Sequence, residues 1–385
     1  MQKRFTPDEG GVFPEWEEVT LGDIAEFSRG KGLTKKDVFK KGKRKCLLYG
    51  QLQVRYGTVI KNVTGMTDVE LKNPVLSKSG DVLISGTISA GLAKASCIKE
   101  DGVIIGGDIN ILRPKEGIDG EFLARAINAN TKKFKRFLEG SVILHLKNEN
   151  IKEVSIRIPK SIEEQRKIAA ALAAYDEMIA VKTAKLETWQ ECKKRMVKEI
   201  FGRTKRFKDD DGREFPEWEE ETLGEIVSIT TGKLNANEMV DGGQFDFYTS
   251  GVDVFKIDKA AFDGPAITVA GNGANVGCLH LADGKFNAYQ RTYVLQDFLA
   301  CREYIYAAIE VTLPNVIKKY KRGSAIPYIV MDMLADLKIP LPCMGEQQKI
   351  GNFLAEIDKE IQIQKEFIKT YAEGKNRMIR ELVGC

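Results

Sequence analysis

Histidine is nearly absent from this chain of 385 residues, which contains only His145 and His280. The two stand at positions that do not correspond in the internal repeat described below. A Ser-His-Asp or Cys-His catalytic site therefore has no support, and we interpret both histidines as surface or packing residues. No H-E-x-x-H sequence or Cys/His cluster indicates a metal site, and no G-x-x-x-x-G-K-[ST] sequence indicates ATP binding through a P-loop.

Cysteines and long apolar runs are also scarce. The seven cysteines are odd in number and form no C-x-x-C pair, which predicts reduced thiols rather than a disulfide framework or a zinc site. No apolar run approaches the roughly 20 residues that span a bilayer. Residues 1–10 are polar and lack the apolar core of a signal peptide. These features predict a cytoplasmic localisation and no membrane association.

The positive charge is concentrated in the first half of the chain. Residues 25–158 contain 25 Lys and Arg against 14 Asp and Glu, whereas residues 227–340 contain 11 against 12. The first half is therefore suited to a polyanion, and the second half offers only a local basic patch. The residues of this patch are Lys318, Lys319, Lys321 and Arg322.

Two long stretches carry the same coiled-coil pattern, with apolar residues alternately four and three positions apart. The seam residues are Ile168, Leu172, Tyr175, Ile179, Leu186, Trp189, Met196 and Ile200 in the first stretch, and Ile350, Leu354, Ile357, Ile361, Ile368, Tyr371, Met378 and Leu382 in the second. Polar residues interrupt both seams at matching steps, at Lys182 and Lys193 and at Gln364 and Lys375. Each seam would extend about 50 Å as a helix. We expect the two to pair within one chain; pairing between chains is the alternative.

The chain is a tandem duplication. Residues 3–24 align with residues 205–226 with 15 identities in 22 positions, and both contain F-P-E-W-E-E-x-T-L-G-x-I. A second marker, E-Q-x-K-I, begins at Glu164 and at Glu346. The regions between the markers barely resemble each other, which indicates one scaffold that holds two different recognition regions. Because the end of each long stretch leads into the start of a repeat, we expect a pseudo-two-fold arrangement with antiparallel helices.

Between the markers, short apolar runs bounded by Gly, Asp or Pro predict strands, and longer segments predict helices. Strands are predicted at 81–85, 102–105, 109–112, 266–269 and 291–295, and helices at 121–138 and 301–319. Ser161 to Glu164 fits a capping box at the start of the first long helix.

The predicted fold class is α/β (mixed α+β), with two globular domains in tandem pseudo-two-fold repeat, separated by two long antiparallel coiled-coil helices. The predicted bounds are 1–158 for the first globular domain, 159–202 for the first long helix, 203–340 for the second globular domain and 341–385 for the second long helix.

A Gly-rich turn follows an apolar strand in each copy, at 85–91 and at 271–277. Such a turn can hold a cofactor phosphate or the S-adenosylmethionine of a methyltransferase, but the pattern alone is weak. No two prolines are adjacent, so the Pro-Pro motif that an amino-methyltransferase places beside its target amine is missing. Close approach of the backbone to a DNA strand would explain both turns, and a plain structural turn is the alternative for either.

Basic, amide, hydroxyl and aromatic side chains in the divergent regions are candidates for DNA binding. Basic residues position phosphates, and Gln, Asn and Arg can read base edges. A solvated lysine-rich loop is the alternative for any one of them. The candidates are Lys31, Lys35, Lys36, Arg44, Lys45, Tyr49, Gln51, Arg55, Tyr56, Thr87, Ser89 and Lys94 in the first copy, and Lys233, Asn235, Tyr248, Ser250, Asn272, Asn275, Tyr289, Gln290, Arg291, Lys318, Lys321 and Arg322 in the second.

The ordered double set of F-P-E-W-E-E-x-T-L-G-x-I, Gly-rich turn, E-Q-x-K-I and heptad helix resembles the specificity subunit of type I restriction–modification enzymes. The resemblance covers essentially the whole chain. It implies two recognition domains, each of which reads one half of a bipartite double-stranded DNA site, and a coiled coil that sets the gap. It also implies two modification subunits, which methylate adenine with S-adenosylmethionine, and restriction subunits, which translocate DNA with ATP and Mg. The specificity chain itself would hold no cofactor and catalyse nothing.

The sequence therefore predicts a non-catalytic DNA-recognition subunit whose helices dock the modification subunits. Two alternatives remain open at this point. One is a DNA adenine methyltransferase with its own Gly-rich cofactor loop, and the other is a coiled-coil scaffold with no role in DNA binding.

Overall fold

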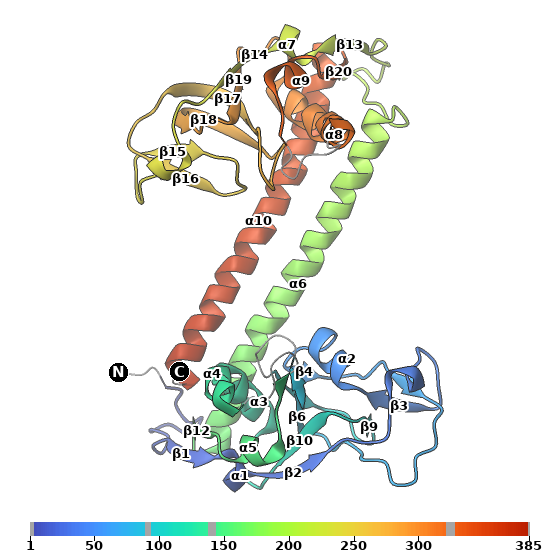
Figure 1. The fold of residues 1–385 in the computed structure, drawn as a ribbon, viewed down its shortest axis with the longest axis vertical. Helices are drawn as coiled ribbons and strands as arrows, with labels where there is room; N and C mark the ends of the chain where they lie inside the picture. The colour runs from blue at the N-terminus through green and yellow to red at the C-terminus, as the bar shows by residue number, and fades with distance from the viewer. Residues whose placement is uncertain (1–3, 89–93, 138–143, 321–327, 384–385) are drawn as a thin grey trace. The chain divides into compact units, whose positions relative to one another are not determined.

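The computed structural model describes residues 4–88, 94–137, 144–320 and 328–383. It contains two compact units, and each combines one globular region with parts of both long helices (Figure 1). The first unit comprises Met1–Val181 and Phe367–Cys385, and the second comprises Lys182–Glu366. The long helices α6 (Ile162–Phe201) and α10 (Met344–Val383) each contain 40 residues and contribute to both units.

The first unit is built on a five-stranded sheet in the order β2-β10-β6-β8-β4. Helix α3 covers one face, where Phe122, Leu123 and Ile127 pack with Val82 and Ile84 in the core. The elements are β1 (Glu17–Thr20), α1 (Leu21–Ile24), β2 (Ala25–Arg29), η1 (Lys35–Asp37), β3 (Arg44–Leu47), α2 (Tyr49–Val54), β4 (Val59–Ile60), β5 (Met66–Thr67), β6 (Val82–Ser85), β7 (Thr87–Ile88), β8 (Ala95–Ile98), β9 (Ile104–Ile105), β10 (Ile109–Pro114), α3 (Gly120–Ala129), α4 (Thr131–Phe134), η2 (Lys135–Phe137), β11 (Leu144–His145), α5 (Asn148–Lys152) and β12 (Ser155–Ile158).

The second unit is built on a six-stranded sheet in the order β14-β19-β17-β18-β15-β16. Helix α8 packs on it, with Tyr304 and Ala308 against Ile267 and Val269. The elements are β13 (Glu219–Thr222), α7 (Leu223–Ile226), β14 (Ser228–Thr231), η3 (Ala236–Glu238), β15 (Phe245–Tyr248), β16 (Val254–Ile257), β17 (Phe262–Ala270), β18 (Leu279–Ala288), β19 (Thr292–Gln296), α8 (Arg302–Tyr320), α9 (Met331–Ala335) and β20 (Lys338–Leu341).

The predicted strands are confirmed as β6, β9, β10, β17 and β19, and the second predicted helix as α8. The helix predicted at 121–138 is wrong as one element, because α3 ends at Ala129 and the short helix α4 follows. Asn130 lies at the break: its φ of −101° and ψ of 20° leave the helical region, and its side-chain amide donates to the carbonyl of Ala126 at 2.9 Å. An Asn side chain at such a position competes with the helical backbone for hydrogen bonds.

The two seams pair in an antiparallel manner within each unit. In the first unit, Ile168 and Leu172 share a core with Leu382, and the ring of Tyr175 lies edge-on to that of Tyr371, with centroids 6.3 Å apart. In the second unit, Met196, Trp189 and Leu186 share a core with Ile350, Leu354 and Ile361. In both units the early part of one helix meets the late part of the other. The predicted antiparallel pairing within one chain is confirmed.

Two of the polar residues that interrupt the seams form equivalent ion pairs. Lys375 Nζ lies 2.5 Å from Asp176 Oδ1 in the first unit, and Lys193 Nζ lies 2.8 Å from Asp358 Oδ1 in the second. Asp176 and Asp358 correspond in the repeat, as do Lys193 and Lys375. The two units therefore share an equivalent interhelical Lys–Asp pair in the seam.

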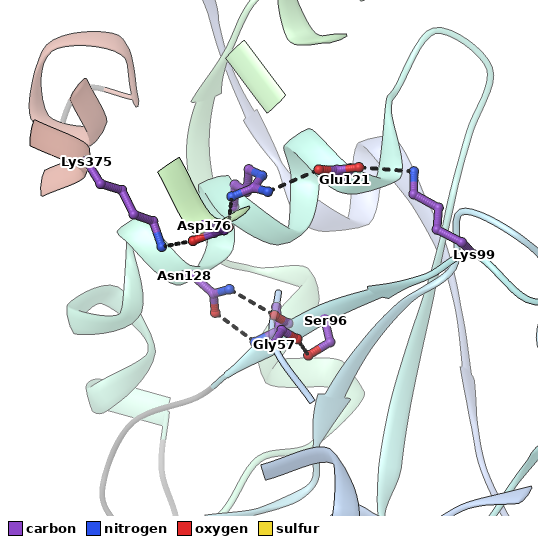
Figure 2. A network of polar contacts seen from close by, with 9 residues as sticks. Gly57, Ser96, Lys99, Glu121, Asn128, Asp176 and Lys375 are labelled. Carbon is purple, nitrogen blue, oxygen red and sulfur yellow. Dashed lines mark hydrogen bonds and ion pairs between the residues drawn. The ribbon is translucent and has the colours of Figure 1, made fainter. Parts of the chain in front are cut away.

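Each globular region adds a residue of a different charge to this pair. In the first unit, Arg125 of α3 lies 2.8 Å from Asp176 and 3.0 Å from Glu121, which is paired in turn with Lys99 (Figure 2). In the second unit, Glu310 of α8 lies 2.6 Å from Lys193. A Lys–Asp pair can accept either sign, because a cation binds its carboxylate and an anion binds its ammonium group.

The repeated sequence markers meet at a buried carboxylate. Glu164 is 1% exposed and accepts hydrogen bonds from Arg4 at 2.9 Å and from the indole N–H of Trp16 at 3.2 Å. In the second copy, Glu346 accepts from Arg206 at 2.8 Å and from Trp218 at 2.9 Å. The marker F-P-E-W thus supplies the tryptophan, and E-Q-x-K-I supplies the carboxylate. The marker pair ties the opening segment of each copy to its long helix.

The Gln and Lys of E-Q-x-K-I also bind backbone. Gln165 accepts from the N–H of Asp119 at 2.8 Å, and Gln347 accepts from the N–H of Cys301 at 2.9 Å, in each case just before the helix of the globular region. Lys167 and Lys349 donate to carbonyls of the opening segments at 2.7 and 2.8 Å. All three polar residues of the marker are therefore used to join the helix to its globular region.

The capping box predicted at Ser161 forms only in part. The N–H of Glu164 donates to Ser161 Oγ at 3.5 Å, but the carboxylate of Glu164 bonds to Arg4 and Trp16. The reciprocal bond of a capping box is replaced by a tertiary contact, because a buried carboxylate is stabilised more by a charged donor.

Candidate nucleic-acid interface

Three chain segments meet at one edge of the main sheet in the first unit. They are the ends of β2 and β6 and the start of β10, which lies between them. The N–H of Gly30 donates to the carbonyl of Ile109 at 2.9 Å, and the N–H of Gly86 donates to the carbonyl of Asp108 at 2.7 Å. We call this edge reading edge 1. The segment 31–43, which we call the basic loop, leaves the sheet at this edge and leads to β3.

The second unit has an equivalent edge, formed by the ends of β14 and β17 and the start of β19. Here the N–H of Gly232 donates to the carbonyl of Thr292 at 3.2 Å, and the N–H of Gly271 donates to the carbonyl of Arg291 at 2.8 Å. We call it reading edge 2. The matching bonds make Ile109 equivalent to Thr292, and therefore Asp108 equivalent to Arg291.

The glycines that open the two Gly-rich turns allow close packing within the protein. A Cβ on Gly86 would lie 2.9 Å from Asp108 Oδ1, and a Cβ on Gly271 would lie 2.6 Å from the carbonyl oxygen of Arg291. A Cβ at Gly271 would meet fixed backbone, and one at Gly86 would force the Asp108 side chain to move. The structural-turn interpretation therefore explains these two glycines.

The first-copy candidates fall into two groups. Lys31, Lys35, Lys36, Arg44 and Arg55 are exposed, and Tyr49 is 41% exposed. The other described candidates already make contacts within the protein, and Ser89 lies outside the described residues.

Five first-copy candidates take part in local structure. Lys45 is paired with Glu100, and Thr87 donates to Asp108. Gln51 accepts from the N–H of Leu48 at 3.0 Å, and the hydroxyl of Tyr56 accepts from the N–H of Thr64 at 3.0 Å. Lys94 donates to the carbonyl of Tyr56 at 2.5 Å, and burial lowers its pKa. These contacts indicate a supporting role for the five.

In the second copy, most candidates gather at reading edge 2. Lys233, Asn235, Asn275, Gln290 and Arg291 are exposed, and Tyr289 is half-buried. Gln290 donates to Asn235 Oδ1 at 3.2 Å, and Ser250 donates to Asn272 Oδ1 at 2.7 Å. Lys318 is exposed near the end of α8, whereas Lys321 and Arg322 lie outside the described residues.

Tyr248 has a packing role in this structure. It is only 5% exposed, its ring lies edge-on to Phe286, and burial raises its pKa to about 12. Its hydroxyl donates to the carbonyl of Leu281 at 3.4 Å, so the side chain is used within the protein.

Asp108 is absent from the candidates predicted from the sequence, which are basic, amide, hydroxyl and aromatic residues. Asp108 Oδ1 lies 2.6 Å from Arg29, and its other oxygen accepts from Thr87. Asp108 also has φ of 67°, a conformation that non-glycine residues seldom adopt. The short sequence Gly106-Gly-Asp108 between two strands was the available signal for a tight turn.

Within the described residues, no cluster of His, Cys, Asp and Glu is arranged to hold a metal ion. The same part of the chain contains no helix that is long and apolar enough to cross a membrane.

Comparison with known proteins identifies the two repeats. Residues 14–188 and 216–370 both match the family described as the type I restriction modification DNA specificity domain. The chain belongs to this family. It carries two copies of the domain in tandem, as the duplication predicted. Membership supports the predicted role as a non-catalytic specificity subunit over a methyltransferase or a scaffold.

Individual relatives are similar along different lengths. The chain is 36% identical to the EcoDI specificity subunit of Escherichia coli over 146 residues, which cover 37% of this chain and 32% of that protein. It is 22% identical to the MjaVIII specificity subunit of Methanocaldococcus jannaschii, over 99% of this chain and 95% of that protein.

A solved structure shares the fold. The type I restriction–modification S subunit from M. genitalium is 17% identical, with a TM-score of 0.75 over 96% of each chain. The predicted fold class, with tandem mixed α/β domains and long helices, is confirmed.

Proposed function

We propose that this specificity chain reads a bipartite double-stranded DNA site, with one half-site bound by each recognition domain. Residues 1–158 and 203–340 form the recognition domains, and residues 159–202 and 341–385 form a helical spacer that sets the gap. The family match over both copies carries this proposal. The two reading edges support it, because equivalent sheet edges present different side chains.

Reading edge 1 and its loop would bind DNA mainly through charge. The exposed residues Lys31, Lys35, Lys36, Arg44 and Arg55 suit contacts to phosphates, which supply affinity that depends on salt. Reading edge 2 presents amides together with Lys233 and Arg291, which suits base edges more than a long phosphate track. The two half-sites would therefore differ in sequence.

The partners follow from the family. We propose that two modification subunits dock on this chain and methylate adenine with S-adenosylmethionine, and that restriction subunits use ATP and Mg to translocate DNA. The spacer helices keep exposed faces away from their seam for such docking. We also propose a cytoplasmic location, which suits the buried thiols of Cys46 and Cys97, whose pKa values burial raises to about 11 and about 12.

Selection from random DNA, with the chain purified together with the subunits that bind it, tests the proposal. We expect two unlike half-sites at one fixed separation. A complex that assembles but enriches no sequence would overturn the proposal and leave a scaffold.

A further inference from the structure

Reading edge 1 contains an arginine that is held in place by an acid. Arg29 ends β2; its side chain is 49% exposed, and its Nη2 lies 2.6 Å from Asp108 Oδ1. The second oxygen of Asp108 accepts from Thr87. Because both carboxylate oxygens are bonded, Asp108 fixes one side of the guanidinium and leaves the rest of it at the surface.

The backbone around this pair is fixed as well. The carbonyl of Asp108 accepts from the N–H of Gly86 at 2.7 Å, and the carbonyl of Gly86 accepts from the N–H of Leu146 at 2.9 Å. A Cβ on Gly86 would come within 3.3 Å of Arg29 Nη2, so the missing side chain leaves room for the pair. Arg29 therefore lies at a strand end whose surroundings are held by backbone hydrogen bonds.

A neighbouring carboxylate distinguishes Arg29 from the lysines beside it. A phosphate that approaches Arg29 also approaches the carboxylate of Asp108, which repels it. A base edge carries no net charge and meets no such repulsion. An arginine can donate two parallel hydrogen bonds to O6 and N7 of guanine in the major groove, and this is the commonest specific contact of that kind.

Reading edge 2 provides a natural contrast. Arg291 occupies the position equivalent to Asp108 and is exposed, and its side chain makes no ion pair or hydrogen bond with the described parts of the chain. The turn that carries it is fixed, since the N–H of Gln290 donates to Leu234 at 2.8 Å. The same turn position thus carries a negative charge in one domain and a positive charge in the other.

We propose that Arg29 reads a guanine in the half-site bound by the first domain, and that Asp108 is its positioning residue. This inference rests on the proposed function, because it assigns a base contact within a DNA-binding edge. The proposed contact involves one base pair of the first half-site and no base of the other half-site.

The test repeats the selection from random DNA with the complete complex and three variants. Arg29→Lys keeps the charge but loses the two-fold hydrogen bond. Asp108→Asn keeps the turn, because Asn tolerates a positive φ, but loses the charge that orients Arg29. Lys31→Gln is the control: it removes an exposed cation two positions away, for which the described residues supply no carboxylate partner that would keep a phosphate away.

The Arg29→Lys complex should lose discrimination about tenfold or more at one G·C pair of the first half-site. Its preference at every other position and the gap should stay unchanged. Asp108→Asn should weaken the preference at that same pair. Lys31→Gln should weaken binding to all sequences alike and lower the slope of log affinity against log salt by about one.

If Arg29→Lys keeps the wild-type preference at every position, the inference is overturned and the proposed function stands. If the Arg29→Lys complex loses sequence preference across the whole first half-site, Arg29 supports the domain and does not read a base. That result also overturns the inference. If the wild-type complex itself enriches no sequence, the proposed function fails first.

Discussion

At the scale of single residues, the two buried carboxylates Glu164 and Glu346 explain why both sequence markers are repeated. Each binds an arginine and a tryptophan from the segment that opens its copy of the repeat. Removal of the charge from such a buried, hydrogen-bonded carboxylate is destabilising, because its donors are then left poorly satisfied.

Glu164→Gln should therefore destabilise the first unit by about 2 kcal/mol, because an amide accepts less strongly than a carboxylate and adds donors of its own. Hydrogen exchange measured by mass spectrometry should show faster exchange in the opening segment and in the first part of α6. Glu346→Gln is the matched variant and should affect the second unit instead. Equal protection of both units in both variants would show that the carboxylates do not hold these segments.

The ion pairs of Lys193 should contribute to the free energy of unfolding at neutral pH, and this contribution should disappear at high pH. Burial opposes the charge of Lys193, but Glu310 and Asp358 outweigh burial, and its pKa is raised above the ordinary value of 10.5. Since the folded state holds the proton more tightly, this stabilisation is complete below pH 10.5 and is lost as the pH rises through the raised pKa.

Replacement of Lys193 by Met should cost about 1–2 kcal/mol at neutral pH, because the carboxylates of Glu310 and Asp358 lose their common partner. Chemical denaturation of both proteins between pH 7 and about pH 11.5 would measure the difference. The difference in free energy of unfolding between wild type and variant should decrease only above the ordinary lysine pKa. A difference that is constant across this range would argue against the ion pairs.

At the scale of elements, the sequence predicted what is periodic or local. The seams of α6 and α10 could be found because each residue that faces the partner recurs at the a/d spacing. The break between α3 and α4 could not, since it depends on one amide of Asn130 and the burial around it. The order of the strands could not be predicted either, because β10 pairs with β2 and β6 across long stretches of chain.

The candidate site could be predicted in location more than in detail. Composition indicated the basic loop after Lys31, and the repeat indicated the turn at Gln290. Composition cannot show which cation is already paired: Lys45 meets Glu100, which is 55 positions away in the chain. Asp108 was overlooked for the same reason, since its partner Arg29 is 79 positions away.

The basic loop of reading edge 1 should contribute phosphate contacts. Replacement of Lys31, Lys35 and Lys36 by Gln should reduce the slope of log affinity against log salt by up to about three, since each phosphate contact contributes about 0.9. Titration of DNA binding by the assembled complex at several salt concentrations would measure this slope.

The matched control replaces Lys61, Lys78 and Lys115 by Gln. These lysines are also exposed, but they flank strands at the opposite end of the same sheet. This control has the same net charge as the test variant. If both triple variants lower the slope equally, the effect is a property of net charge, and reading edge 1 is not the DNA-binding face.

At the scale of the whole molecule, the chain combines two unlike recognition domains with one repeated attachment. Each domain is tied to its long helix by the same Glu, Gln and Lys, and each adds a charged side chain to an interhelical Lys–Asp pair. Uniform attachment allows the loops at the reading edges to differ without any change in how a domain joins the spacer. We propose that helix length then sets the gap between the half-sites.

The most direct test shortens both helices by one heptad. Deletion of residues 179–185 from α6 and 361–367 from α10 removes matching steps of the repeat and keeps the a/d spacing of the remaining seam residues. It removes about 10 Å of helix, which corresponds to about three base pairs. Selection from random DNA with the assembled complex should return both half-sites unchanged with a gap shorter by about that amount. Recovery of the same half-sites at the original gap would show that helix length does not set the gap.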